Sequence, residues 1–221
     1  TAYLSVMWFS LAATSEQFTA LNGANIAIVL LITLWALRLG TFLFMRIHKD
    51  GEDKRFRSIK PSATQFFMTW TLQGLWVSMC SMCALTAISS ETGVVMNALF
   101  YIGLGLFVYG FCTEIIADNQ KSKFRSVPEN RDKFITTGLW AKSRHPNFFG
   151  EIVLWAGVAV MSFSSLNGLQ YLTLISPVFT YLLLVYVSGV RMLEARADKK
   201  WGQDEEYIKY KSETPVLMIK Y

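Results

Sequence analysis

Long apolar runs separated by shorter polar stretches dominate the pattern along this chain. A helix needs about 20 mostly apolar residues to cross a bilayer, and the runs are continuous rather than alternating, which excludes a transmembrane β-barrel. A short apolar stretch at 3–13 has the pattern of the end of a further span whose beginning is missing. The runs of suitable length are 26–47, 66–88, 94–116, 148–163 and 171–190. The pattern therefore predicts an all-α, polytopic membrane bundle of about six to seven transmembrane helices.

The polar segment that follows the last run, residues 191–221, has a helical pattern of its own. Met192, Leu193, Ala197 and Trp201 form an apolar stripe at helical spacing. Aromatic residues then recur at Tyr207 and Tyr210, as in an amphipathic segment at a membrane interface. With no internal repeat or low-complexity segment, we expect residues 1–221 to form one membrane domain with an amphipathic tail.

Charged residues are scarce but concentrated on one side of the predicted membrane. Only 17% of the residues are charged, against about 25% in soluble domains. The 21 lysines and arginines exceed the 16 acids, giving a net charge of +5. Connections without any Lys or Arg alternate with basic ones, and the basic segments are 46–61, 117–147 and 191–221. The positive-inside rule places these basic segments on the cytoplasmic or equivalent side.

The same distribution bears on partners and location. Because the basic excess accompanies transmembrane spans, it predicts contact with anionic lipid and excludes a nucleic-acid-binding protein. The expected location is an inner bacterial membrane, the endoplasmic reticulum or another organelle membrane. The substrate, the organelle and the oligomeric state do not follow from these features.

The densest polar cluster lies where the fourth apolar run begins. Pro146 prevents a regular helix from passing through His145, so a new helix is predicted to start at Pro146 or Asn147. Its free N–H groups, together with Arg144, His145 and Asn147, make a potential anion site. Glu151 lies one turn further on the same face, where an acid within a span is costly and typical of function. A simple helix cap with interfacial polar residues is the alternative.

A second polar group lies at the end of the third apolar run. Glu114 and Asp118 are four residues apart and share a helical face. Two such acids repel each other unless a cation or a hydroxyl donor, for example a ribose, bridges them. Neutralisation by Arg125 or Lys121 is the alternative interpretation. Arg38 is the one basic residue inside a span, and snorkelling or an ion pair with a buried acid would explain it.

Metal chemistry finds little support in the sequence. Cys80 and Cys83 form a CxxC pair, but inside an apolar span and without a second pair, so we expect core packing. His48 and His145 are the only histidines. Gly103, Gly105 and Gly110 also lie within a span, which favours close helix packing over a nucleotide loop. We expect no metal site, and no catalytic residue can be assigned.

From about Leu34 to Leu217, the chain resembles the steroid 5-alpha-reductase superfamily. The matching motifs are Trp35 with Arg38-Leu39-Gly40, Gly51–Phe56, Gln73 with Trp76, Glu114 through Arg125, Gly138–Trp140, Ser143–Glu151 (SRHPNFFGE), Ser188–Gly202, and Tyr207 through Leu217. The resemblance implies an integral membrane fold with NADPH bound at the cytoplasmic side. It also implies hydride transfer to an activated C=C bond of a hydrophobic, sterol-like enone.

Position by position, the resemblance implies cofactor contacts for six residues. These are Glu114, Asp118, Arg125, Asn147, Glu151 and the tail tyrosine Tyr210. With the donors of the polar cluster added, the candidate cofactor-binding residues are Glu114, Asp118, Arg125, Arg144, His145, Asn147, Glu151 and Tyr210.

Two alternatives to the reductase stay open. In the steroid enzymes a tyrosine holds the substrate ketone, and Trp35 stands at or near that position here, so activity is in question. Isoprenylcysteine and phospholipid methyltransferases use S-adenosylmethionine and have an RHPxYxG-like motif, often with a Glu-Glu pair, which Glu205-Glu206 could match. The second alternative is a non-catalytic, reductase-like subunit of a larger membrane complex. Asn147 with Glu151, and the group Glu114, Asp118 and Arg125, favour the reductase.

Overall fold

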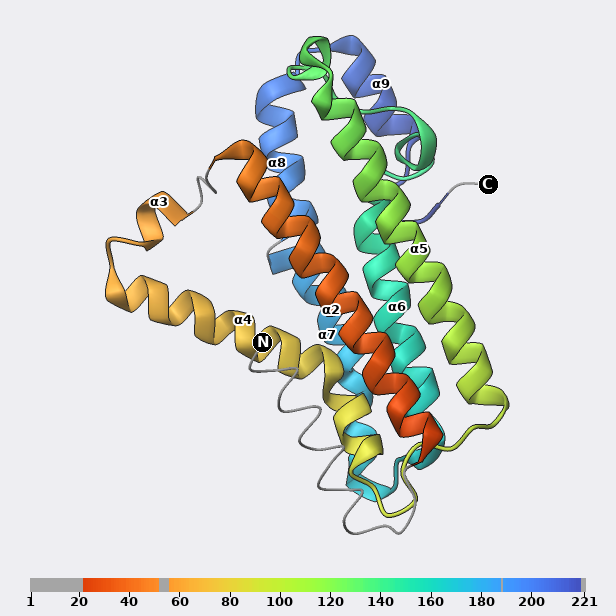
Figure 1. Ribbon diagram of the computed structural model, residues 1–221. Helices are drawn as coiled ribbons and strands as arrows, with labels where there is room; N and C mark the ends of the chain where they lie inside the picture. The colour runs from red at the N-terminus through yellow and green to blue at the C-terminus, as the bar shows by residue number, and fades with distance from the viewer. Residues whose placement is uncertain (1–21, 52–55, 188, 220–221) are drawn as a thin grey trace. The chain divides into compact units, whose positions relative to one another are not determined.

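The computed structural model describes residues 22–51, 56–187 and 189–219, and this part of the chain is helical throughout (Figure 1). The α-helices are α2 (Gly23–Asp50), α3 (Phe56–Ile59), α4 (Ala63–Ile88), α5 (Ala98–Ser126), α6 (Pro146–Ser162), α7 (Ile175–Leu182), α8 (Val190–Trp201) and α9 (Glu205–Glu213). The 3-10 helices are η1 (Pro128–Asn130), η2 (Gly138–Ala141), η3 (Phe163–Ser165) and η4 (Gly168–Leu174), and a π-helical turn, η5, covers Leu183–Val187.

The prediction of a polytopic helical membrane protein is confirmed. Five helical segments among the described residues are long and apolar enough to cross a bilayer. These segments are Gly23–Lys49, Ala63–Ile88, Ala98–Ser126, Pro146–Ser165 and Gly168–Trp201. Each contains one of the five predicted runs or most of it, whereas the short stretch predicted at 3–13 lies outside the described residues.

Proline and glycine set the helix boundaries that matter for the polar end of the molecule. Helix α5 continues ten residues past its apolar run and ends at Ser126, directly before the Val127-Pro128 turn. Its polar last part therefore stays helical and carries Asp118 and Arg125. Helix α6 begins at Pro146, as predicted, because proline suits the first turn of a helix.

The contacts divide the chain into two compact units, one of which holds α2, α3, α4 and residues 161–174. Asn25 in this unit is buried, and its side chain accepts a hydrogen bond from Val94 N at 2.7 Å. Asn22 donates to Val94 O, also at 2.7 Å. These hydrogen bonds attach the connection before α5, which has no Lys or Arg, to the start of α2. Cys80 and Cys83 are buried without a disulfide, in agreement with core packing.

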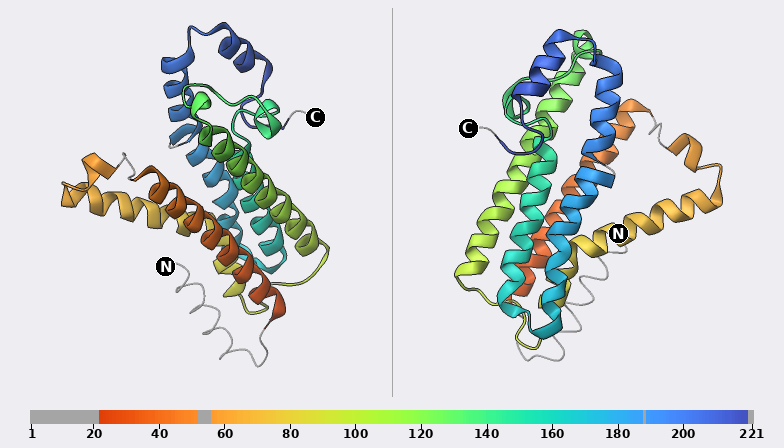
Figure 2. Two further views of the ribbon diagram at one scale, coloured as in Figure 1. Left: turned by 45° about the horizontal axis from the view of Figure 1, so that its top comes forward. Right: turned by 180° about the vertical axis from the view of Figure 1, so that it is seen from behind.

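The second unit holds residues 101–160 and the described residues from 175 onward. Its centre is the antiparallel pair of α5 and α6, which run side by side in all three views (Figures 1 and 2). Backbone meets backbone where they cross: a Cβ on Gly110 would lie 2.4 Å from Gly150 O, and one on Gly157 2.6 Å from Gly103 O. The packing role expected for the span glycines therefore holds for Gly110 and Gly103, whereas a Cβ added to Gly105 would meet nothing within 4 Å.

The fifth apolar run is less regular than predicted. Helix α7 passes into the π-helical turn η5, and α8 begins after Gly189, whose backbone comes so close to Leu184 O that a Cβ would clash. In α8 the predicted stripe is partly correct, because Leu193, Ala197 and Trp201 are half-buried while Met192 is exposed. This break starts α8 as a separate helix that presents polar side chains to the start of α6.

Candidate functional site

The loop between α5 and α6 is anchored to α5 by a buried tryptophan. Trp140 lies in η2, and its indole Nε1 donates to Ala117 O at 3.0 Å. Gln120 accepts a hydrogen bond from Leu139 N at 2.9 Å, and its side chain fills the space that a Cβ on Gly138 would need. These contacts place residues 142–145, which follow η2, beside the polar end of α5.

The C-terminal segment holds Arg144 and His145 from the other side. The residue before a proline is extended, so the N–H groups here find no helical partner. Arg144 N donates to Pro215 O at 2.9 Å, and His145 N donates to Val216 O at 3.1 Å. The Ser143 hydroxyl donates to Leu217 O at 3.0 Å. Two side chains next to the start of α6 are thereby held by backbone contacts.

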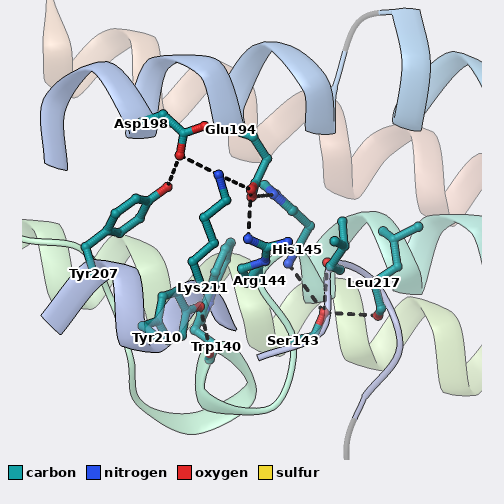
Figure 3. A network of polar contacts seen from close by, with 11 residues as sticks. Trp140, Ser143, Arg144, His145, Glu194, Asp198, Tyr207, Tyr210, Lys211 and Leu217 are labelled. Carbon is teal, nitrogen blue, oxygen red and sulfur yellow. Dashed lines mark hydrogen bonds and ion pairs between the residues drawn. The ribbon is translucent and has the colours of Figure 1, made fainter. Parts of the chain in front are cut away.

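The side chains of Arg144 and His145 both contact Glu194 on α8 (Figure 3). Arg144 Nη1 lies 2.9 Å from Glu194 Oε2, and His145 Nε2 lies 2.7 Å from Glu194 Oε1. Lys211 of α9 approaches Glu194 at 3.7 Å and pairs more closely with Asp198, which also accepts a hydrogen bond from the Tyr207 hydroxyl. A network of ion pairs therefore joins the start of α6 to α8 and α9.

Burial favours the neutral form of His145 in this network. Its side chain is only 7% exposed, and this burial, only partly opposed by Glu194, lowers the pKa of His145 below its usual 6.5. A carboxylate can only accept a hydrogen bond, so the neutral ring carries its hydrogen on Nε2, facing Glu194. Arg144 is then the principal positive charge that faces Glu194.

The four polar side chains predicted on α5 and α6 lie at one level of the helix pair. Glu114, Asp118 and Glu151 are buried, and Asn147 Nδ2 donates to Asp118 Oδ1 at 3.4 Å. A Cβ on Gly150 would lie 2.8 Å from Glu114 N, so the backbone of α6 contacts α5 at Glu114. Glu151 is the next residue of α6 after this contact. The structure therefore brings together Glu114, Asp118, Asn147 and Glu151 as an acceptor-rich group.

Arg125 and Tyr210 lie apart from this group. Arg125 is exposed in the last turn of α5, two turns beyond Asp118, and makes no ion pair with the described residues. Tyr210 on α9 donates its hydroxyl to Trp140 O at 2.7 Å, and burial raises the pKa of Tyr210 to about 12. Its ring also packs against Phe134. Tyr210 thus contributes to the attachment of α9 to the loop.

We expect Tyr210→Phe to reduce stability rather than cofactor affinity. The change removes the hydrogen bond to Trp140 O, which costs about 1 kcal/mol of unfolding free energy, and keeps the aromatic packing. Denaturant unfolding in detergent measures this loss, and a cofactor titration of the same variant should stay within about threefold of the wild type. A much larger loss of affinity would show that Tyr210 contacts the cofactor.

The sequence analysis missed Glu194, Asp198 and Lys211 as members of the polar cluster. Glu194 and Asp198 are four residues apart and so share one face of α8. This spacing was a usable signal, but the dense mixture of charges in 191–200 has the composition of an exposed helix. Only the tertiary fold shows that this face meets Arg144 and His145.

Comparison with known proteins gives a family and one named relative. The model of a family described as "Protein of unknown function (DUF1295)" matches residues 2–214. A probable O-methyltransferase, ustE, of Ustilaginoidea virens is 29% identical over 116 residues, which are 46% of this chain and 41% of that relative. This chain therefore matches less than half of the relative's length. No solved structure matches this chain. Neither finding names a reductase, so the resemblance to steroid 5-alpha-reductases stays a prediction. Because the family match covers nearly the whole sequence, the chain belongs to the DUF1295 family.

Proposed function

We propose that this membrane protein transfers a methyl group from S-adenosylmethionine to an apolar small molecule. The polar end of the second unit, where α5, α6, α8 and α9 meet, is the proposed site. The name of the fungal relative supports methyl transfer, as does the polar motif before α6, which resembles that of membrane methyltransferases. The predicted orientation places this end of the molecule on the cytoplasmic or equivalent side.

The proposal rests on the ion pairs that basic side chains form at the polar end of the second unit. NADPH brings a pyrophosphate and a further phosphate, which require several available cations. Here Arg144 is held by Glu194, Lys211 by Asp198, and burial favours the neutral form of His145. Arg144, the cation of the predicted anion site before α6, thus already has a carboxylate partner within the chain.

The acceptor-rich group on α5 and α6 fits S-adenosylmethionine better. Its members Glu114, Asp118, Asn147 and Glu151 offer carboxylate and amide oxygens at one level of the helix pair. Such oxygens accept hydrogen bonds from ribose hydroxyls and from an ammonium group, and they favour a positive charge nearby. S-adenosylmethionine supplies an electrophilic methyl group on a sulfonium when bound. These four residues are the ones we expect to hold it.

Reduction of an activated C=C bond with NADPH is the second candidate, and one observation favours it. Arg125 is exposed and lies on the same face of α5 as Asp118, where it could bind a phosphate. The start of α6 at Pro146 adds the positive end of a helix. Arg125 therefore distinguishes the two cofactors.

Cofactor binding to the full chain in detergent tests the proposal. We expect S-adenosylmethionine to bind and NADPH not to bind in isothermal titration. Asp118→Asn and Asn147→Ala should weaken binding roughly 10- to 100-fold, because each removes a hydrogen bond that involves a charged group. Glu213→Gln, on the exposed end of α9, is the matched acid-to-amide control and should leave the affinity unchanged.

Arg125→Ala separates the alternatives. Methyl transfer predicts an unchanged affinity for S-adenosylmethionine in this variant, since no phosphate needs binding. NADPH binding by the wild type that Arg125→Ala abolishes would replace the proposal with the reductase. If neither cofactor binds and other membrane proteins co-purify at fixed stoichiometry, the chain is a non-catalytic subunit and the proposal is wrong.

A further inference from the structure

The protonation state of His145 is set by its surroundings and leaves one nitrogen available. Nε2 must carry a hydrogen because it lies 2.7 Å from a carboxylate oxygen of Glu194, which can only accept. Nδ1 is buried and has no hydrogen-bond partner among the described residues. A hydrogen on Nδ1 would be a buried donor without an acceptor, which is costly. Nδ1 therefore carries a lone pair that accepts no hydrogen bond from the described residues.

The imidazole ring is also held in one orientation. Glu194 is fixed by Arg144 at 2.9 Å and approached by Lys211 at 3.7 Å, so its carboxylate has little freedom to turn away. Phe148, one turn into α6, stacks on the ring with centroids 5.7 Å apart and an interplanar angle of 10°. A carboxylate on one ring nitrogen fixes the tautomer and stabilises the imidazolium that forms when the other nitrogen takes a proton.

We propose that Nδ1 of His145 accepts the proton of a substrate hydroxyl during methyl transfer, with Glu194 and Arg144 as positioning residues. This inference rests on the proposed methyltransferase function. The substrate O–H bond breaks with its proton passing to Nδ1, and the oxygen's electron pair forms the new O–C bond. The C–S bond breaks with its pair left on sulfur as a neutral thioether. The positive charge thus moves from the sulfonium to an imidazolium that faces Glu194.

The strength of this base defines the substrate. Burial lowers the pKa of His145, with Lys121 and Arg144 adding to the effect and Glu194 opposing it. A phenol ionises at about pH 10 and gives up its proton to such a base far more readily than a hydroxyl as weakly acidic as water, which ionises at about 15.7. The substrate that fits is an apolar molecule with a phenolic or enolic hydroxyl.

Methyl transfer to acceptors of graded acidity tests this role. The acceptors are a hexylphenol, a hexyl-substituted nitrophenol that is already ionised at the assay pH, and a long-chain alcohol, each in mixed micelles. We expect the wild type to methylate both phenols much faster than the alcohol. His145→Gln keeps a donor toward Glu194 but lacks the base, so transfer to the hexylphenol should fall about 10²- to 10⁴-fold. Transfer to the ionised nitrophenol should fall less than about tenfold, since no proton remains to be removed.

His48→Gln, the same substitution at the exposed second histidine, is the control and should change neither rate. An equal loss on both phenols in His145→Gln would show a structural role and overturn the inference, as would no loss on either. Methylation of the alcohol at a comparable rate would overturn the substrate class. If the wild type binds no S-adenosylmethionine, the proposed function itself fails, and this is seen before any acceptor is added.

Nitrogen NMR of ¹⁵N-histidine-labelled protein supplies a readout that needs no activity. With two histidines in the chain, the His145 signals are those lost in His145→Gln. At pH 7.5 we expect a non-protonated Nδ1 and a protonated Nε2, and Glu194→Ala, which leaves no acceptor at this position, should remove this fixed tautomer. A protonated Nδ1 in the wild type would exclude it as a proton acceptor whatever cofactor binds.

Discussion

Glu194→Ala is expected to lower the free energy of unfolding by about 3 kcal/mol, the low end of the usual cost of removing one partner from a buried ion pair. Arg144 and His145 both point at this carboxylate, and their side chains are only 11% and 7% exposed. Without Glu194, Arg144 is left as a buried charge lacking its partner, and the contact that joins α8 to the start of α6 is lost. The 18% exposure of Glu194 lets some water replace it, which keeps the cost at the low end. Denaturant titration in detergent, followed by tryptophan fluorescence, measures this loss.

Asp132→Asn is the matched control for Glu194. Asp132 also forms an ion pair, with Lys200 at 2.8 Å, but its side chain is 94% exposed. Water screens exposed ion pairs, so they contribute little to stability and this variant should unfold near the wild-type midpoint. Similar losses in the two variants would mean that burial does not protect the Glu194 network, and that α8 does not pack against residues 144 and 145.

Hydropathy and proline were sufficient to predict most of the fold. The length needed to cross a bilayer is a property of the membrane, so continuous apolar runs indicate spans without knowledge of the tertiary structure. Pro146 and Pro128 likewise mark helix boundaries through local sterics alone. The irregular passage through η5 and Gly189 escaped prediction, because the hydropathy of 171–190 is the same for a straight and a broken helix.

The candidate site could be predicted only where its residues share a helix. Glu114 with Asp118, and Asn147 with Glu151, are four residues apart, so helical geometry alone puts each pair on one face. Glu194 is 49 residues from His145, and nothing local indicates their contact. Tyr210 stays a prediction as a cofactor contact, and its place in a motif gave no indication that its hydroxyl donates to Trp140 O.

Gly110→Ala should separate α5 from α6 and cost about 2–3 kcal/mol of unfolding free energy, as overpacking of a tight contact does. The added Cβ would lie 2.4 Å from Gly150 O and 2.6 Å from Leu154 N. Both are backbone atoms, so no side chain can rotate to make room and the helices must move apart. Asp118 lies two turns from Gly110 on α5 and would lose its 3.4 Å contact with Asn147 on α6. We therefore expect weaker cofactor binding together with lower stability, measured by titration and by thermal unfolding in detergent.

Gly105→Ala is the control that separates the effect of the α5–α6 contact from the effect of alanine's higher helix propensity. Gly105 lies on the same helix, and an added Cβ would meet nothing within 4 Å. Alanine is the better helix former by up to about 1 kcal/mol, so Gly105→Ala should be neutral or slightly stabilising. The same substitution thus has opposite signs at two positions five residues apart, and only contact with α6 distinguishes them. Equal effects would mean that α5 and α6 do not meet at Gly110, and that the acceptor-rich group is not assembled by this pair.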